Sequence, residues 1–259
     1  MRTLAHLSDL HFGRVDPELL EPLARQVREL APDVVVVSGD LTQRARAEQF
    51  REARRFLDTL PRPQIVVPGN HDVPLYNVLR RFFAPLDNYR RYISEDPEPA
   101  YIDEEIAVIG INTARSFVFK GGRVGEEQIA RVRERLCGID ERVVKVLVTH
   151  HPFELPEGAN ERALVGRAHQ AMRAFAGCGA DLILSGHMHE SHARDASARY
   201  GLKTGAPLLV HAGTATSTRG RGETNSFNAI RIDAGRVEVE RYSWDPQIRH
   251  FAGASLRPL

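Results

Sequence analysis

The chain has 259 residues, of which 42% are hydrophobic, and its formal net charge at pH 7 is +1. This length and composition predict a globular protein that buries a substantial core. The near-neutral charge excludes an overall basic field of the kind that draws a protein to nucleic acid or to an anionic membrane, so any attraction for an anionic substrate must be local.

Short apolar runs rich in β-branched residues alternate with amphipathic stretches along the first two thirds of the chain. In chain order the predicted strands and helices are Leu4–Leu7, Glu18–Leu30, Val34–Val37, Ala47–Leu60, Ile65–Val67, Tyr76–Tyr92, Ile106–Ile111, Glu126–Leu136, Val143–Val148, Arg167–Ala176 and Leu182–Leu184. This alternation is typical of βαβ units with a largely parallel sheet. The strands are almost continuously hydrophobic, as expected when both faces of a sheet are covered.

The pattern changes at about residue 191. Strand-like stretches at Leu208–His211, Phe227–Ile232 and Val237–Ser243 follow one another without a helix between them, and residues 233–235 favour a hairpin turn. We therefore predict an α/β protein whose residues 1–259 form one domain, with a mainly antiparallel β region in the C-terminal third.

The cysteines and the N-terminus favour a cytoplasmic protein. Cys137 lies near the end of a predicted helix and Cys178 lies in a Gly-Cys-Gly turn, an arrangement that does not resemble a disulfide framework. The first residues lack the apolar run of a signal peptide, and no later stretch approaches the ~18 apolar residues of a membrane span. We expect a soluble, unexported chain with reduced cysteines.

Residues that commonly bind metals follow five of the predicted strands. In chain order they are Asp9, His11, Asp40, Asn70, His71, Asp72, His150, His151, His187 and His189. Because the carboxyl ends of parallel strands meet at one edge of a sheet, where ligands bind, these side chains are expected to converge. Oxygen and imidazole donors without a thiolate suit Zn, Mn or Fe better than Ca or a closed structural zinc site.

Five ordered segments carry a resemblance to a known family. They are Asp9-Leu10-His11, Gly39-Asp40, Gly69-Asn70-His71-Asp72, Thr149-His150-His151 and Gly186-His187-Met188-His189. Together they resemble the calcineurin-like metallophosphoesterases, and residues 212–219 and 225–228 are similar to the bacterial class III cyclic-nucleotide phosphodiesterase branch. The resemblance implies a four-layer α/β/β/α sandwich of two mixed sheets flanked by helices, and two divalent or trivalent ions of Mn, Fe or Zn.

The resemblance also implies a role for each motif residue. One ion would be held by Asp9, His11, Asp40 and His189, and the other by Asp40, Asn70, His150 and His187. Asp40 would bridge the pair, and a hydroxide between the ions would attack the phosphorus in line. His71 would stabilise or protonate the leaving group, and Asp72 would orient the His71 ring.

Several residues have alternative interpretations. His151 adjoins His150 and is its rival as a ligand, or else packs behind the site or reaches toward the substrate. Arg115, Arg219 and Arg221 lie in loops expected to face the same edge, where guanidinium groups clamp phosphate; solvated loop arginines are an equal alternative. His211 also ends a strand at this edge, with a structural or solvent role as its alternative, and the remaining histidines are expected to lie outside the site.

The leading functional hypothesis is an enzyme that hydrolyses small phosphodiesters, with cyclic nucleotides as the first substrates. The alternatives are a glycerophosphodiesterase or phosphomonoesterase, a metal-dependent nuclease, and an inactive binding scaffold. Substrate choice is expected to depend on the loops Arg115–Val124, Glu154–Val165 and Arg194–Gly205. The oligomeric state is open, with a homodimer among the alternatives.

Overall fold

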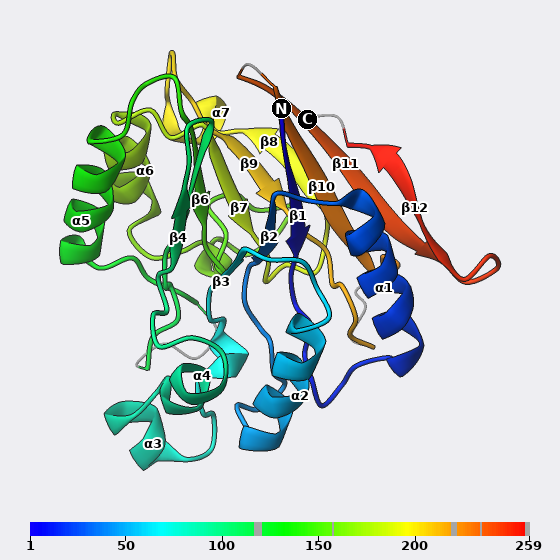
Figure 1. Cartoon of the computed structure of the whole chain (residues 1–259). Helices are drawn as coiled ribbons and strands as arrows, with labels where there is room; N and C mark the ends of the chain where they lie inside the picture. Colours follow the sequence, from blue (N-terminus) through cyan, green and yellow to red (C-terminus); the bar gives the residue numbers. More distant parts are fainter. Residues whose placement is uncertain (117–120, 157, 219–221, 234, 257–259) are drawn as a thin grey trace.

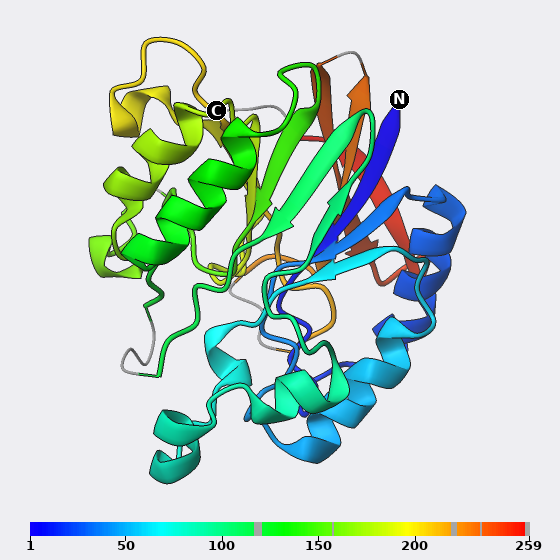
Figure 2. The same ribbon diagram turned by 60° about the vertical axis from the view of Figure 1, so that its left-hand side comes forward.

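Two six-stranded sheets pack face to face, and helices cover the outer face of each (Figures 1 and 2). The computed structural model describes residues 1–116, 121–156, 158–218, 222–233 and 235–256. The expected four-layer α/β/β/α sandwich is therefore confirmed. No helix within these ranges is long and apolar enough to cross a membrane.

The first sheet contains the N-terminal strands and the last three strands of the chain. Its spatial order is β12 (His250–Ser255), β11 (Arg236–Asp245), β10 (Ser226–Asp233), β1 (Arg2–Leu7), β2 (Val34–Val37) and β3 (Gln64–Val66). β1, β2 and β3 are parallel, whereas β10 pairs antiparallel with β1. The carboxyl ends of three successive strands therefore meet at one edge.

The second sheet is built from the middle of the chain. Its spatial order is β4 (Ala100–Ile102), β5 (Ile106–Gly110), β6 (Val144–Val148), β7 (Leu182–Ser185), β9 (Leu208–His211) and β8 (His192–Asp195). β5, β6, β7 and β9 are parallel, and the outer strands β4 and β8 are antiparallel to their neighbours. Both sheets are mixed, and most of the antiparallel pairing lies in the C-terminal third.

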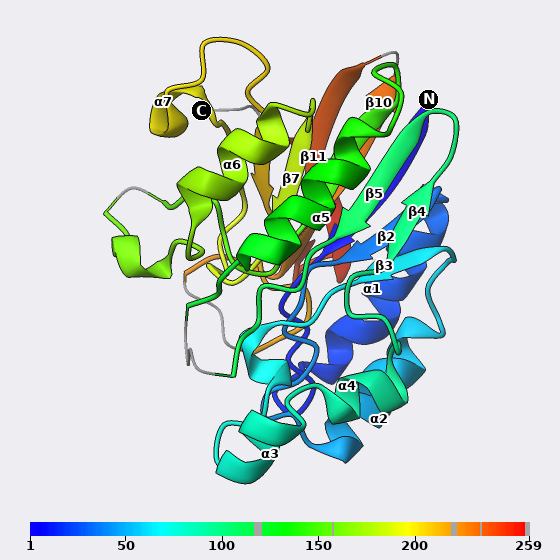
Figure 3. The same cartoon turned by 90° about the vertical axis from the view of Figure 1, so that its left-hand side faces the viewer.

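The helices are α1 (Pro17–Leu30), α2 (Ala47–Leu57), α3 (Val78–Phe83), α4 (Asp87–Tyr92), α5 (Glu126–Cys137), α6 (Ala168–Ala176) and α7 (Ser197–Tyr200). The longer helices α1, α2, α5 and α6 are amphipathic and bury one face, and Figure 3 shows α5 and α6 on the outer side of the second sheet. In α1 the side chain of Asp16 caps the N-terminus by accepting from the Glu18 amide, and Leu19, Leu23 and Val27 form a buried stripe. α1, α2 and α4 cover the first sheet, and α5 and α6 cover the second.

Alternate residues of the strands divide between two layers of the core. Val34 and Val36 of β2 contribute to the layer between the sheets, whereas Val35 and Val37 pack under the helices. All four valines are fully buried. The central strands are hydrophobic on both faces for this reason, as the sequence predicted.

Two differences from the predicted elements have a local cause. The predicted helix Tyr76–Tyr92 is divided into α3 and α4, because Pro85 has no amide hydrogen and disfavours helix in the preceding residue. The strands β4, β8 and β12 were not predicted. They are edge strands, and most of their residues are half-buried or exposed, so their sequences have no strong hydrophobic pattern.

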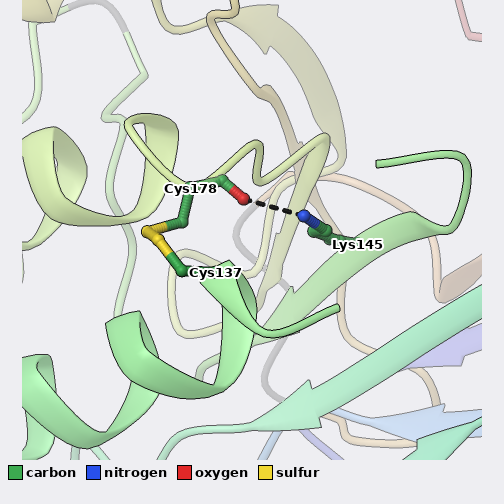
Figure 4. The surroundings of a disulfide bond; sticks show 3 residues. All are labelled: Cys137, Lys145 and Cys178. Carbon is green, nitrogen blue, oxygen red and sulfur yellow. Dashed lines mark hydrogen bonds between the residues drawn. A yellow bond between two sulfur atoms is a disulfide. The ribbon is translucent and has the colours of Figure 1, made fainter. Parts of the chain in front are cut away.

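The prediction of two reduced cysteines is wrong. Cys137, at the end of α5, is disulfide-bonded to Cys178, in the turn after α6, across a separation of 41 residues (Figure 4). In the same place the Lys145 ammonium donates to the Cys178 carbonyl oxygen at 3.0 Å. The packing of α5 beside α6 brings the two sulfurs together, so the argument for a reducing compartment loses its support.

Replacement of both cysteines by alanine is expected to lower the free energy of unfolding by about 4 kcal/mol, because a closed loop of this length restricts the unfolded chain. For a chain of this size the midpoint of thermal unfolding should fall by roughly 10 °C. Calorimetry under non-reducing conditions measures the shift, and reduced wild-type protein is the control. Two free thiols in denatured, non-reduced wild type would contradict the pairing.

Candidate metal centre

The predicted ligand residues converge at the edge of the sandwich toward which β1 points (Figure 1). They come from the loops after β1, β2, β3, β6 and β7, where the carboxyl ends of parallel strands lie together. Four groups have potential ligand atoms within 4.8 Å of one another: Asp9, His11 and His189; His11, Asp40 and His71; Asp9, Asp40 and His150; and His150, His151 and His187. The groups share members and form one cluster.

The backbone at this cluster is strained. Asp9, His11, Asp40, His187 and His189 have φ angles of 53°, 52°, 52°, 72° and 62°. Such values cost on the order of 1–3 kcal/mol per non-glycine residue and gather at functional sites. The turns also need close backbone approaches: a Cβ at Gly186 would collide with the Ser8 hydroxyl, and one at Gly69 with the Asp40 carboxylate.

Asp9, His11 and His189 form the first half of the cluster and are buried. Asp9 Oδ1 lies 3.5 Å from His11 Nε2 and 3.4 Å from His189 Nε2. Among the described residues, neither Asp9 Oδ1 nor His11 Nε2 has a hydrogen-bond partner. A buried polar atom without a partner is destabilising, and a cation among these atoms would satisfy them. Two hydroxyls fix the orientation of these donors. Thr214 Oγ1 lies 2.5 Å from His189 Nδ1, and Ser8 Oγ donates to Asp9 Oδ2 at 2.7 Å.

The second half of the cluster is centred on His150. Its Nδ1 donates to the Ser38 carbonyl oxygen at 2.8 Å, which turns Nε2 toward the site. That nitrogen lies 3.2 Å from Asn70 Oδ1 and 3.3 Å from His187 Nδ1. Three donor atoms from three loops therefore surround one position.

The carboxylate of Asp40 lies between the two halves. Its Oδ1 is 3.4 Å from His150 Nε2, and its Oδ2 is 3.7 Å from His11 Nε2. The same Oδ1 accepts from the His71 amide at 2.8 Å. This is the position that a ligand shared by two metal ions would require.

Burial and charge act in opposite directions at this centre. Burial raises the pKa of the Asp40 carboxyl, but the neighbouring His150 and other imidazoles outweigh it and hold that pKa well below its usual range. Burial lowers the pKa of His150, but the Asp40 charge outweighs it and raises the pKa to about 9. Burial lowers the pKa of His187 to about 3. Without a cation His150 holds a proton, which a bound metal ion would displace.

His151 lies beside His150 but has different partners. Its Nδ1 lies 2.8 Å from the Thr113 hydroxyl, and its Nε2 has no hydrogen-bond partner. It joins His150 and His187 in one of the groups above. Of the pair, only His150 also faces Asp40 and Asn70. These contacts favour His150 as the ligand, and His151 lines the site beside it.

Asp72 was expected to orient the His71 ring, but its carboxylate contacts backbone amides instead. Its carboxylate accepts from the amides of Gly69, Leu41 and Thr42 at 2.9 to 3.1 Å, and also from the Thr42 hydroxyl. It therefore holds the loop that carries Asp40. Burial, and then the Asp40 charge, raise the pKa of Asp72 to about 6 against these hydrogen bonds.

His71 has another partner for its ring. Nδ1 lies 3.0 Å from the Gln43 carbonyl oxygen, and the ring meets that of His11 edge to face with centroids 5.0 Å apart. The Gln43 carbonyl holds this half-buried imidazole. It lies at the border of the cluster, beside His11 and Asp40.

Arg115, one of the predicted phosphate-binding arginines, does not join the cluster. Arg115 donates to Gln128 Oε1 at 2.6 Å and lines a charged cleft of about 460 Å³ at the start of α5. Arg219 and Arg221 lie outside the described residues. The loop Arg194–Gly205 begins in β8, which runs away from the site. Its Arg199 nevertheless contacts Glu154 and Glu161 in the segment after β6.

Two buried histidines support the centre from behind. His211 is fully buried and stacks on His192 with ring centroids 4.0 Å apart, outside the groups of potential ligands. His6 lies with Nε2 2.9 Å from Ser38 Oγ, and the Ser38 carbonyl orients His150. The sequence analysis missed this support, and that of Thr214 and Gln43, because a small polar residue or a lone histidine has no signal until the fold supplies its partner.

The donor set has the chemistry of a transition-metal site. Carboxylate, imidazole and amide donors surround two adjoining positions without a thiolate, and several buried donors lack protein partners. Around one position are Asp9, His11, Asp40 and His189, and around the other are Asp40, Asn70, His150 and His187.

Comparisons with known proteins identify the family and related folds. Residues 2–191 match the sequence profile of the family described as calcineurin-like phosphoesterase. A cAMP/cGMP dual specificity phosphodiesterase of Mycobacterium tuberculosis is 26% identical over 88% of this chain and 75% of its own length. A glycerophosphodiester phosphodiesterase of Enterobacter lignolyticus is 38% identical, but the match spans only 27% of this chain and 29% of that protein. The fold is similar to that of a dimetal phosphatase from Danio rerio, with a TM-score of 0.64, 14% identity and 99% of each chain covered.

Proposed function

The chain belongs to the calcineurin-like phosphoesterase family, and from this premise we propose that it hydrolyses small phosphodiesters with two metal ions. The position of Asp40 carries the proposal, because its two oxygens face the two halves of the cluster. Mn, Fe and Zn are the ions that these oxygen and nitrogen donors favour.

The ions would be held by the two overlapping sets of four residues described above. Bound there, they would supply a nucleophile from water at neutral pH and offset the charge of the phosphate. The remaining work falls to the chain. Asp72 holds the Asp40 loop, Ser38 orients His150, and Gln43 holds the His71 imidazole at the border of the cluster. His71 would stabilise or protonate the leaving oxygen.

Cyclic nucleotides are the first substrates to test, because a relative matched over most of this chain is named for cAMP and cGMP. Glycerophosphodiesters are the second candidate, since a shorter match carries that name. A nuclease is disfavoured, because the net charge of +1 provides no overall basic field for a polyanion.

A substrate panel with metal analysis of the same preparation tests the proposal. The metal-loaded protein is expected to hydrolyse bis(p-nitrophenyl) phosphate and at least one natural diester, among cyclic AMP, cyclic GMP, 2′,3′-cyclic nucleotides, glycerophosphodiesters and short DNA. Exhaustive chelation should remove the activity and Mn, Fe or Zn should restore it. Faster turnover of phosphomonoesters than of every diester would overturn the diester assignment, and inactivity with every ion would favour a binding scaffold.

A further inference from the structure

A cleft of about 810 Å³ opens beside the candidate metal centre. The segment after β6 lines one side with Pro156, Asn160 and Arg162, and the loop after β7 lines the other with His187, Met188 and Glu190. Because His187 belongs to the metal cluster, a group bound in this cleft would adjoin a phosphate at the metals. The volume lies in the range of small-molecule sites and accommodates a nucleoside.

Two opposite charges line the cleft without pairing with each other. In the described part of the chain, the half-buried Glu190 carboxylate and the exposed Arg162 guanidinium take part in no ion pair and no side-chain hydrogen bond. Asn160 uses Oδ1 to accept from the Arg162 amide at 2.9 Å, which leaves its amino group as a donor. The described lining of the cleft therefore offers one strong acceptor and two donors.

This charge pattern discriminates between classes of leaving group. An anionic group would be attracted by Arg162 but repelled by Glu190. An ammonium group would be attracted by Glu190 but repelled by Arg162. A neutral hydroxyl donates to the carboxylate and accepts from the guanidinium or amide, so it satisfies both. A carboxylate that binds sugar hydroxyls is also how dinucleotide-binding folds read ribose.

We propose that this cleft binds the leaving group of the substrate as a neutral, hydroxyl-bearing group, a glycerol or a nucleoside sugar, with Glu190 as the hydroxyl acceptor. The inference rests on the proposed phosphodiesterase function and adds to it the chemical class of the leaving group. Glu190 directly follows the cluster residue His189, so a hydroxyl near it lies close to the bond that is broken.

Matched pairs of diesters test the inference. The first pair is methyl glyceryl phosphate and methyl propyl phosphate, which differ only in two hydroxyls of the leaving group. The second pair is the methyl ester of adenosine 5′-phosphate and its 2′,3′-dideoxy analogue. The pair in which loss of the hydroxyls lowers kcat/KM more shows whether the leaving group is a glycerol or a nucleoside. Wild type is expected to favour the hydroxylated member in kcat/KM, and Glu190→Gln should reduce that preference about tenfold. Released alcohol is measured by NMR, with metal content and thermal stability checked for each protein.

Glu104→Gln is the matched control, because Glu104 is exposed in the turn between β4 and β5, away from the cleft. It should retain the full preference. Equal kcat/KM for both members of each pair, or an unchanged preference in Glu190→Gln, overturns the cleft assignment while leaving diester hydrolysis intact. A Glu190-dependent preference for methyl 2-aminoethyl phosphate overturns the neutral class. Absence of hydrolysis of these diesters and of bis(p-nitrophenyl) phosphate by metal-loaded protein overturns the proposed function, and the cleft assignment with it.

Discussion

Replacement of Asp40 by asparagine is expected to reduce kcat/KM for bis(p-nitrophenyl) phosphate by more than ~10³-fold, because the loss of a shared metal ligand removes several kcal/mol of transition-state stabilisation. Asp40 is the carboxylate whose two oxygens face both halves of the cluster, at 3.4 Å from His150 and 3.7 Å from His11. An amide keeps the shape of the side chain but removes its charge and one acceptor oxygen. Metal content measured by mass spectrometry should fall from two ions per chain to one or none.

The control for this variant is Asp87→Asn, which neutralises an exposed carboxylate on α4 and should keep both ions and full activity. Thermal unfolding of both variants with and without metal separates loss of the centre from loss of the fold. If Asp40→Asn bound two ions and stayed within tenfold of the wild-type rate, Asp40 would not be the shared ligand and the two-metal assignment would be wrong.

The fold was predictable where local sequence and burial agree. The central strands are continuous apolar runs because helices cover one face and the second sheet covers the other, as the four valines of β2 show. β8 was not predictable in the same way. It has one fully buried residue, Ala193, and depends on the hydrogen bonds of β9. An edge strand of this kind is held by hydrogen bonds to its neighbouring strand, and its sequence need not have a hydrophobic pattern.

In the candidate site, too, some features were predictable from the sequence and others were not. The ligand-type residues were recognisable because chemistry and position coincide, each following a strand at one edge of the sandwich. The partners of Asp72 and Arg115 were not recognisable, because they depend on how loops meet in space. The Asp72 carboxylate accepts from the Gly69 amide of its own loop and from the Leu41 and Thr42 amides of the Asp40 loop. Arg115 donates to Gln128 on α5. The disulfide belongs to this second class, since the packing of α5 and α6 determines it.

His71→Ala is expected to retain both metal ions and to lose about 10²–10³-fold in kcat for diesters with an alkyl leaving group, the range typical of a lost proton donor or oxyanion donor. The imidazole is held at the border of the cluster by the Gln43 carbonyl, and its backbone amide donates to Asp40 through an interaction that alanine keeps. The loss should be much smaller for bis(p-nitrophenyl) phosphate, because p-nitrophenolate leaves without protonation. His169→Ala, an exposed histidine on α6, is the control.

The two substrates separate the possible roles of His71. A nitrogen of its ring lies within 4.8 Å of potential ligand atoms of His11 and Asp40, so the ring is also near enough to act as a ligand. If the variant lost one ion and both substrates slowed equally, His71 would be a ligand and not a leaving-group donor. If the metals stayed and both substrates slowed equally, the ring would stabilise the phosphate itself. Only a loss that grows with the basicity of the leaving oxygen supports proton donation, because only that role depends on how much the departing oxygen needs a proton.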